Sequence, residues 1–188
     1  PASRDRSGAF DLVKRNEYLR YLAAFSVIFT FVNSNGEFLL STLVERASGE
    51  AVARGAITAD GVKEWVGETY GRFYLFTNVA TVALQTFVVS RLVRYGGLRV
   101  AFFVLPAIAS FDALGAAAYP VLVVLFWGKV VENGTDYSLN NTLRNMLWLP
   151  TSTEEKYKAK QAIDTFFVRM GDVSSALLVY FMHQLLGL

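Results

Sequence analysis

Apolar residues occur in this sequence in long runs that polar residues interrupt at only a few positions. Five runs are each long enough to form a helix that crosses a hydrocarbon core of about 30 Å. The segment 45–72 is charged and rich in small residues, so we expect it to be an exposed outer connector with a short surface helix. The pattern predicts an all-α membrane protein with five transmembrane helices, at about 19–44, 73–92, 98–118, 120–149 and 162–186.

The composition agrees with a membrane protein and excludes several kinds of chemistry. Of the 188 residues 53% are hydrophobic, and the mean hydropathy of +0.34 is too high for an ordinary soluble domain. The absence of cysteine and the single histidine exclude disulfides, thiolate sites and a multi-histidine metal site within the chain. We find no nucleophile paired with a base and no glycine-rich phosphate loop, so we expect neither an enzyme nor a bound cofactor. The expected surrounding is the lipid bilayer, and no feature indicates a nucleic-acid partner.

The distribution of basic residues predicts the orientation in the membrane. If the five helices cross in succession, the basic N-terminal segment, the turn at 91–99 and the loop at 151–160 lie on the same side. The connector 45–72, on the opposite side, balances its basic residues with acidic ones. By the positive-inside rule, the N-terminus is therefore expected to be cytoplasmic.

Two polar residues lie at the centre of the predicted helix 19–44. Asn33 and Glu37 are four positions apart and share a face. A carboxyl group near the membrane midplane is usually protonated, paired or functional, so we expect Glu37 to bind a proton or to act in gating. For Asn33 we expect either a role in substrate binding or a hydrogen bond to a neighbouring helix.

The predicted helix 120–149 carries more charge than a lipid-facing helix tolerates. Its polar positions recur at intervals of three or four and would share an inward face: Lys129, Glu132 or Asn133, Asp136 or Tyr137, Asn140 and Arg144. Because an arginine can hold phosphate or carboxylate through two hydrogen bonds, we expect Arg144, together with Lys129, to attract an anion. The alternative is a purely structural network, since Lys129 and Glu132 are close enough along the helix to neutralise each other.

The predicted helix 162–186 brings further charges to membrane depth. Arg169 and Asp172 are three positions apart and can form an ion pair. We expect both, together with Asp164, Glu132 and Asp136, to act in proton binding or gating.

Two local features lie outside these candidates. Before the last helix, Thr151 or Ser152 followed by Glu154 or Glu155 resembles a capping box. In the predicted helix 98–118, Asp112 is expected to lie near the outer end in contact with water, and it is left out of the predicted site.

A long stretch of the sequence carries a family resemblance. The residues that carry it are Gly128, Lys129, Asn133, the segment 137–139, Arg144, Met146, the segment 149–150, Lys156, Lys158, Lys160, the segment 162–164 and Gly171, with the segment 33–37 in the first helix. This series resembles the nucleotide transporter family, the ATP/ADP antiporters of plastids and obligate intracellular bacteria with their uncharacterised bacterial relatives.

The resemblance implies a fold, a location and an activity. Members have the twelve-helix major-facilitator fold, in which this chain would be helices 7–11 of the C-terminal half, and the bacterial inner membrane is the implied location. The missing N-terminal half or partner membrane subunits would complete the protein. The implied activity is exchange or uptake of a nucleotide or another anionic metabolite, with Tyr137 and Asn141 as further substrate-binding residues.

The sequence departs from the transporting members at three positions. Asn141 stands in place of an aspartate, Asn145 in place of a glutamate, and Asp172 in place of a lysine. These departures favour the bacterial branch of unknown substrate. An alternative function is a transporter-like accessory or structural subunit of a larger membrane complex that does not itself transport, which we expect if the first half and the last helix of the fold are missing, because five helices cannot build a cavity between two repeats.

Overall fold

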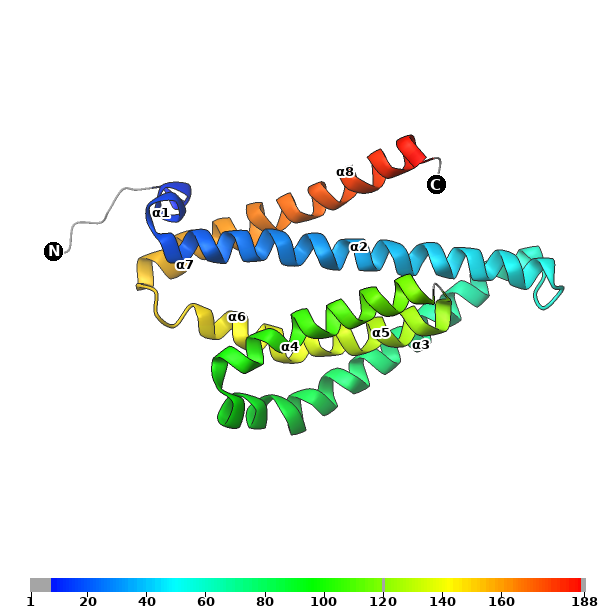
Figure 1. Cartoon of the computed structure of the whole chain (residues 1–188), viewed down its shortest axis with the longest axis horizontal. Helices are drawn as coiled ribbons and strands as arrows, with labels where there is room; N and C mark the ends of the chain where they lie inside the picture. The colour runs from blue at the N-terminus through cyan, green and yellow to red at the C-terminus, as the bar shows by residue number, and fades with distance from the viewer. Residues whose placement is uncertain (1–7, 120, 187–188) are drawn as a thin grey trace. The chain divides into compact units, whose positions relative to one another are not determined.

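A computed structural model describes residues 8–119 and 121–186, which are helical apart from short connections and include no strand. The helices follow one another along the chain as Figure 1 shows. They form two compact units, one from Pro1–Phe38 and Pro150–Leu188 and the other from Leu39–Leu149. The first is called unit 1 and the second unit 2. The long helix α2 (Glu17–Ala53) contributes to both units.

Unit 1 is built around a parallel pair of helical segments. It contains α1 (Ala9–Arg15), the first part of α2, α7 (Thr153–Ala162), the π-helical segment η4 (Ile163–Phe167) and α8 (Val168–Leu186). The helix α1, which the sequence analysis did not predict, packs on α7. Phe10 of α1 lies edge-on to Phe166, with ring centroids 5.1 Å apart, and Nδ2 of Asn16 donates a hydrogen bond to Oε1 of Glu155 at 2.7 Å.

Small residues are prominent among the buried positions of α2 and of the chain from α7 to α8 in unit 1. Those buried in unit 1 are Ala23, Ser26, Ala159, Ala162 and Ser175, together with Gly171. A Cβ atom at Gly171 would stand 2.6 Å from the carbonyl oxygen of Val27, so the two helices meet at backbone distance. Small residues allow this close approach, which drives helix association in membranes by van der Waals packing.

The helix α7 begins with the predicted capping box. The backbone N–H of Glu155 donates to Oγ of Ser152 at 3.3 Å, and the N–H of Ser152 donates to Oε2 of Glu155 at 2.9 Å. Of the alternatives left open by the sequence, the structure selects Ser152 with Glu155. Because the helix begins at Thr153, it starts nine residues before the expected position 162.

Unit 2 is a bundle in which α5 packs between α3 and α4. Its elements are the end of α2, the short 3₁₀-helix η1 (Ala59–Gly61), α3 (Val62–Leu84), η2 (Gln85–Val89), α4 (Ser90–Ala118), α5 (Leu122–Thr135), η3 (Asp136–Asn140) and α6 (Asn141–Leu147), of which η2 and η3 are π-helical. The core contains Leu40, Phe73, Leu125 and Val130, all nearly inaccessible to solvent.

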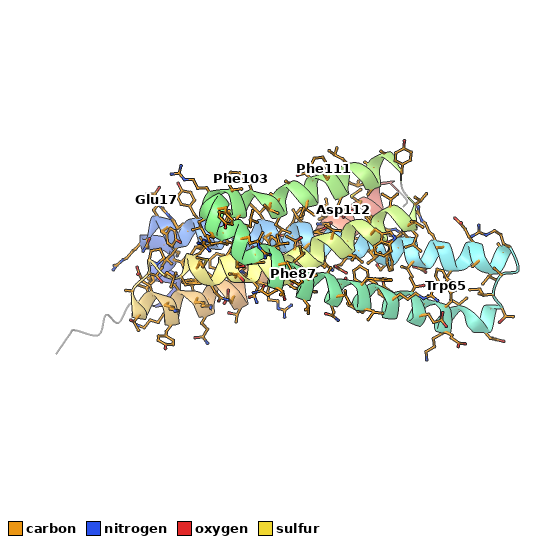
Figure 2. The ribbon with its side chains drawn as sticks, turned by 90° about the horizontal axis from the view of Figure 1, so that it is seen from below. Glu17, Trp65, Phe87, Phe103, Phe111 and Asp112 are labelled. Atoms are coloured by element: carbon orange, nitrogen blue, oxygen red, sulfur yellow. The ribbon has the colours of Figure 1, made fainter. Side chains whose placement is uncertain are left out.

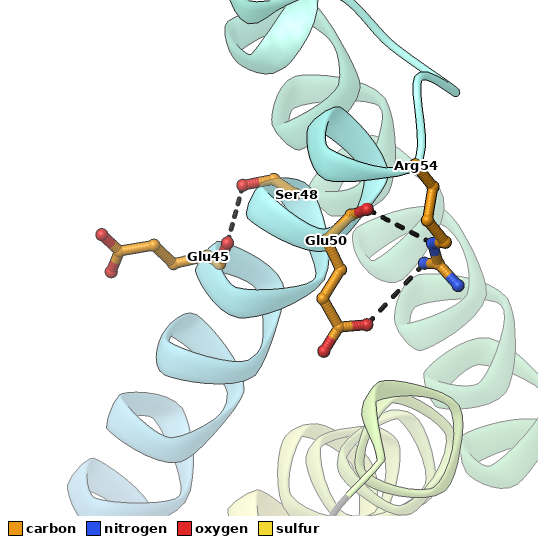
Figure 3. Close-up of polar contacts among 4 residues, drawn as sticks. All are labelled: Glu45, Ser48, Glu50 and Arg54. Carbon is orange, nitrogen blue, oxygen red and sulfur yellow. Dashed lines mark hydrogen bonds and ion pairs between the residues drawn. The ribbon is translucent and has the colours of Figure 1, made fainter.

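The end of α2 extends into the segment expected to be a connector. Instead of ending near 44, the helix continues to Ala53, where Nε of Arg54 donates to the carbonyl oxygen of Glu50 at 3.2 Å (Figure 3). Ser48 and Glu45 make a similar bond one turn earlier, with the Ser48 hydroxyl donating to the Glu45 carbonyl at 2.7 Å. Gly55, with a positive φ of 71°, then turns the chain. Because helices lie on both sides of this turn, most of the segment 45–72 is helical.

A second glycine divides α4. Gly97 has φ 70° and ψ 175°, a conformation outside the helical range that glycine adopts without steric cost. The stretch Ala59–Ala118 would otherwise be a helix of about 90 Å, roughly three times the thickness of a hydrocarbon core. The turn predicted at 91–99, between the helices 73–92 and 98–118, is therefore present as a break at Gly97.

Three described helical stretches are long and apolar enough to cross a membrane, namely Glu17–Ala53, Ala59–Ala118 and Glu155–Leu185. Their large apolar side chains are widely exposed, as Phe87, Phe103 and Phe111 show with exposed fractions of 61%, 73% and 75% (Figure 2). Such surfaces suit contact with lipid. The protein is an integral membrane protein. The charged segment 122–147 is not among the three stretches, so its crossing of the membrane stays a prediction.

Candidate functional site

An ion pair inside unit 2 is the centre of the candidate site. Nζ of Lys129 lies 3.2 Å from Oε2 of Glu132, three positions later on α5. The Lys129 side chain is completely buried and that of Glu132 is 10% exposed. This confirms the pairing that the spacing predicts. Since a buried charge without a partner costs several kcal/mol in a protein interior, each member depends on the other.

The helix α4 brings a third charged group, Asp112, to this pair. The chain directions of α4 and α5 are opposite, and Gly115 of α4 faces Val124 of α5. About one turn further along this contact, the Asp112 carboxyl lies against Gly128. A Cβ atom added to Gly128 would stand only 1.7 Å from Oδ1 of Asp112. Figure 2 marks the position of Asp112 on the ribbon.

The Asp112 carboxyl interacts with the ion pair of Lys129 and Glu132. It is in side-chain hydrogen-bonding contact with Glu132 and within electrostatic range of Lys129. Its Oδ1 atom is buried and has no hydrogen-bond partner among the described residues. The sequence predicts an Asp112 in contact with water; the residue is partly exposed, but its Oδ1 atom is buried, because the absence of a side chain at Gly128 lets the carboxyl pack on α5.

Further residues of the candidate site lie on the π-helical segment η3 and on α6, which follows it. Nδ2 of Asn140 donates to Oδ1 of Asp136 at 2.7 Å, and the Arg144 guanidinium acts on the same carboxylate. Both Glu132 and Lys129 are also within electrostatic range of Asp136. Four ionisable residues of the predicted helix 120–149 and Asp112 of α4 thus form a cluster of five, Asp112, Lys129, Glu132, Asp136 and Arg144, which we call the unit 2 cluster.

Close helix packing holds η3 in place. A Cβ atom at Gly134 would stand 3.0 Å from Cβ of Ala80, so α5 touches α3 just before η3 begins. The segment η3 also packs against η2, which places two π-helical segments side by side. Single π-turns of this kind occur frequently at functional sites. The spacing of polar residues gave no signal for them.

Two predicted substrate-binding residues lie on another face of the helix. The Tyr137 side chain is 50% exposed, and Asn141 is exposed as well. They are next to the unit 2 cluster in sequence, but they do not share its burial.

A second polar group lies in unit 1 around Asp172. Its Oδ1 accepts a hydrogen bond from Oγ of Ser34 at 2.8 Å, and its Oδ2 pairs with Nη1 of Arg169 at 3.0 Å. The second contact confirms the predicted pair, in which Arg169 is 80% exposed. Ser34 was not among the predicted site residues, whereas the neighbouring Asn33 and Glu37, which are partly buried on the same helix, were. Asp164 is exposed.

Neither group has the composition of a metal site. The structure shows, over residues 8–119 and 121–186, no group of three or more His, Cys, Asp or Glu side chains that could hold a metal ion. The unit 2 cluster and the group around Asp172 instead hold positive and negative side chains within helices that expose large apolar residues.

Buried charges inside apolar helices are typical of membrane proteins that move polar or charged solutes. Comparison with known families agrees with this class, because the model of the TLC ATP/ADP transporter family matches residues 76–187. The chain belongs to this family of nucleotide transporters. The matched range contains the whole unit 2 cluster and Asp172, whereas Ser34 precedes it. No curated protein and no solved structure matches the chain.

Proposed function

We propose that this chain is the C-terminal half of a major-facilitator transporter that moves a nucleotide or another anionic metabolite across the bacterial inner membrane by alternating access. In that mechanism the substrate binds near the midplane of the membrane and the two halves rock around it. The rest of the protein, or partner membrane subunits, would supply the other half. The observation that carries the proposal is the position of Arg144 in the unit 2 cluster, inside the range matched by the transporter family.

Arg144 is suited to bind the anion by exchange of partners. Without substrate, the nearby Asp136 carboxylate balances the guanidinium charge. An incoming phosphate or carboxylate can take the place of Asp136 and form two parallel hydrogen bonds with the guanidinium. Asp136 keeps its hydrogen bond from Asn140, so it stays partly compensated when Arg144 turns to the substrate. Lys129, which also acts on Asp136, would add positive charge near the bound anion.

The remaining predicted residues take supporting roles in this proposal. Tyr137 and Asn141, which lie in unit 2 as Arg144 does, would contact other parts of the substrate, and the substrate-binding role of Asn33 in unit 1 stays a prediction. Groups that bind a proton or change partners between states would be Glu37, Glu132, Asp136, Asp164, Arg169 and Asp172.

The test is uptake of radiolabelled ATP, and of inorganic phosphate as a minimal anion, by the intact protein in lipid vesicles. Arg144→Ala should lower uptake at least about tenfold, since more than about 1.4 kcal/mol of binding is lost with the bidentate contact. Arg144→Lys should recover only part of it. The matched control is Arg54→Ala, which removes an arginine from an exposed pair and should leave uptake unchanged. Full uptake by Arg144→Ala would remove this residue from the site.

A second candidate is a transporter-like accessory subunit that does not transport. It is favoured by the complete burial of Lys129 in its pair with Glu132, which a purely structural network would also show. In that case the Arg144→Ala protein would differ from the unmodified protein in stability, and neither would take up anions.

A further inference from the structure

The unit 2 cluster contains more negative than positive groups. Asp112, Glu132 and Asp136 are three carboxyls, and Lys129 and Arg144 are two cations. If all five were ionised, one negative charge would be left without a cation within the cluster. Such a charge in a protein interior costs several kcal/mol, and binding a proton is the usual way to remove it.

The contacts show which carboxyl lacks a cation of its own. Glu132 has Lys129 at 3.2 Å, and Asp136 has Arg144 and the amide of Asn140. Asp112 instead meets the carboxyl of Glu132 and the backbone at Gly128. Ionised carboxylates only accept hydrogen bonds, so two of them in hydrogen-bonding contact need a proton between them.

The charged groups on α4 and α5 are arranged along the cluster. Among residues 8–119 and 121–186, the charged groups that act on Asp112 are Glu132 and Lys129, and Arg144 acts on Asp136 further along. Unit 2 also has a hydrophobic core, which includes Leu125 and Val130 of α5 and Leu40 of α2.

We propose that Asp112 and Glu132 together hold one exchangeable proton, shared in a carboxyl–carboxylate hydrogen bond beside the Lys129 ammonium. One carboxyl carries the O–H and donates it to the other, which remains ionised and paired with Lys129. Loss of the proton leaves two carboxylates in contact and an uncompensated negative charge in the cluster. An anion then meets more repulsion near Arg144, so the proton-bound state is the one that favours anion binding. The proton site itself does not depend on the identity of the substrate.

Infrared spectroscopy of the intact protein in lipid nanodiscs, without substrate, tests this proposal. A protonated carboxyl has a C=O stretching band that is separate from the carboxylate bands. At pH 7 the unmodified protein should show this band, and ¹³C labelling of aspartate or glutamate carboxyls should shift it. Asp112→Asn and Glu132→Gln should each abolish it, because the remaining carboxyl pairs with Lys129 alone. Asp60→Asn, which changes an exposed aspartate of η1, should leave it in place.

The isotope experiment on the unmodified protein needs no variant to fold. Absence of any label-sensitive protonated band at pH 7 would overturn the proposal. So would a band that survives in both Asp112→Asn and Glu132→Gln, since the proton would then reside elsewhere. Neither infrared measurement involves transport, so the proton proposal can fail while the proposed function holds, and the proposed function can fail while the proton proposal holds.

Discussion

The Asp112 carboxyl rests on Gly128, one position before Lys129, at a distance that leaves no room for a Cβ atom. Gly128→Ala should push the carboxyl away from Glu132. Because Oδ1 is the end of a side chain that can turn aside, we expect the free energy of unfolding to fall by only about 1 kcal/mol. The infrared band of the shared proton should shift or vanish, which measures the loss of contact directly.

The control for this substitution is Gly67→Ala on α3, where a Cβ atom would meet nothing within 4 Å. Alanine should stabilise this helical position by about 0.5–1 kcal/mol. An unshifted band in Gly128→Ala would show that the position of Asp112 does not depend on this glycine.

Gly171→Ala should destabilise unit 1 more strongly. The new Cβ atom would meet the carbonyl oxygen of Val27 and, at 2.7 Å, Cβ of Thr30, and backbone atoms cannot turn aside as a side chain does. We expect a loss of about 3 kcal/mol, at the upper end of overpacking effects, measured by thermal or denaturant unfolding in mild detergent. Gly49→Ala, at an open position of α2, is the control and should show no loss. Equal stability of the two variants would contradict the close crossing.

Lys129→Met should be among the most destabilising single changes in unit 2. It leaves Glu132 buried without its cation, at a cost of about 3–5 kcal/mol. The double variant Lys129→Met with Glu132→Gln should recover most of this loss, because no uncompensated charge remains. If the double variant also regains full anion uptake, the pair is structural; we expect stability to return without uptake.

The contact between Ser34 and Asp172 can be measured by a double-mutant cycle. Ser34→Ala and Asp172→Ala should show a coupling energy of about 1–2 kcal/mol, as expected for a hydrogen bond to a charged group. In a second cycle, Arg169→Ala with Asp172→Ala should couple by less than about 1 kcal/mol, because Arg169 is largely exposed. Independent effects of Ser34 and Asp172 would mean that their hydrogen bond contributes nothing to stability.

The sequence predicted those features that arise within one helix. Apolar runs gave the helices, the pair of glycines gave the break at Gly97, and spacings of three gave the pairs Lys129–Glu132 and Arg169–Asp172. Each depends on neighbours along the chain, for which spacing is sufficient information.

The contacts between helices were not predictable in the same way. Asp112 meets α5 and Ser34 meets α8 because of how the helices pack, and a single sequence does not state which faces meet. Asp112 was expected in contact with water for this reason. The extension of α2 to Ala53 was missed because its charged and small residues resemble a loop, although alanine and glutamate are good helix formers.

The π-helical segment η3 also determines which changes of chain length the site can tolerate. A π-turn holds one residue more than an α-turn, so it absorbs an insertion without rotating the helix that follows. Elsewhere in a helix, deleting one residue turns everything after it by about 100°. Within 136–140 a deletion can convert the π-turn into a regular turn and leave Arg144 facing in the same direction relative to Lys129. Relatives that differ by one residue here can therefore keep the same arrangement of the two cations.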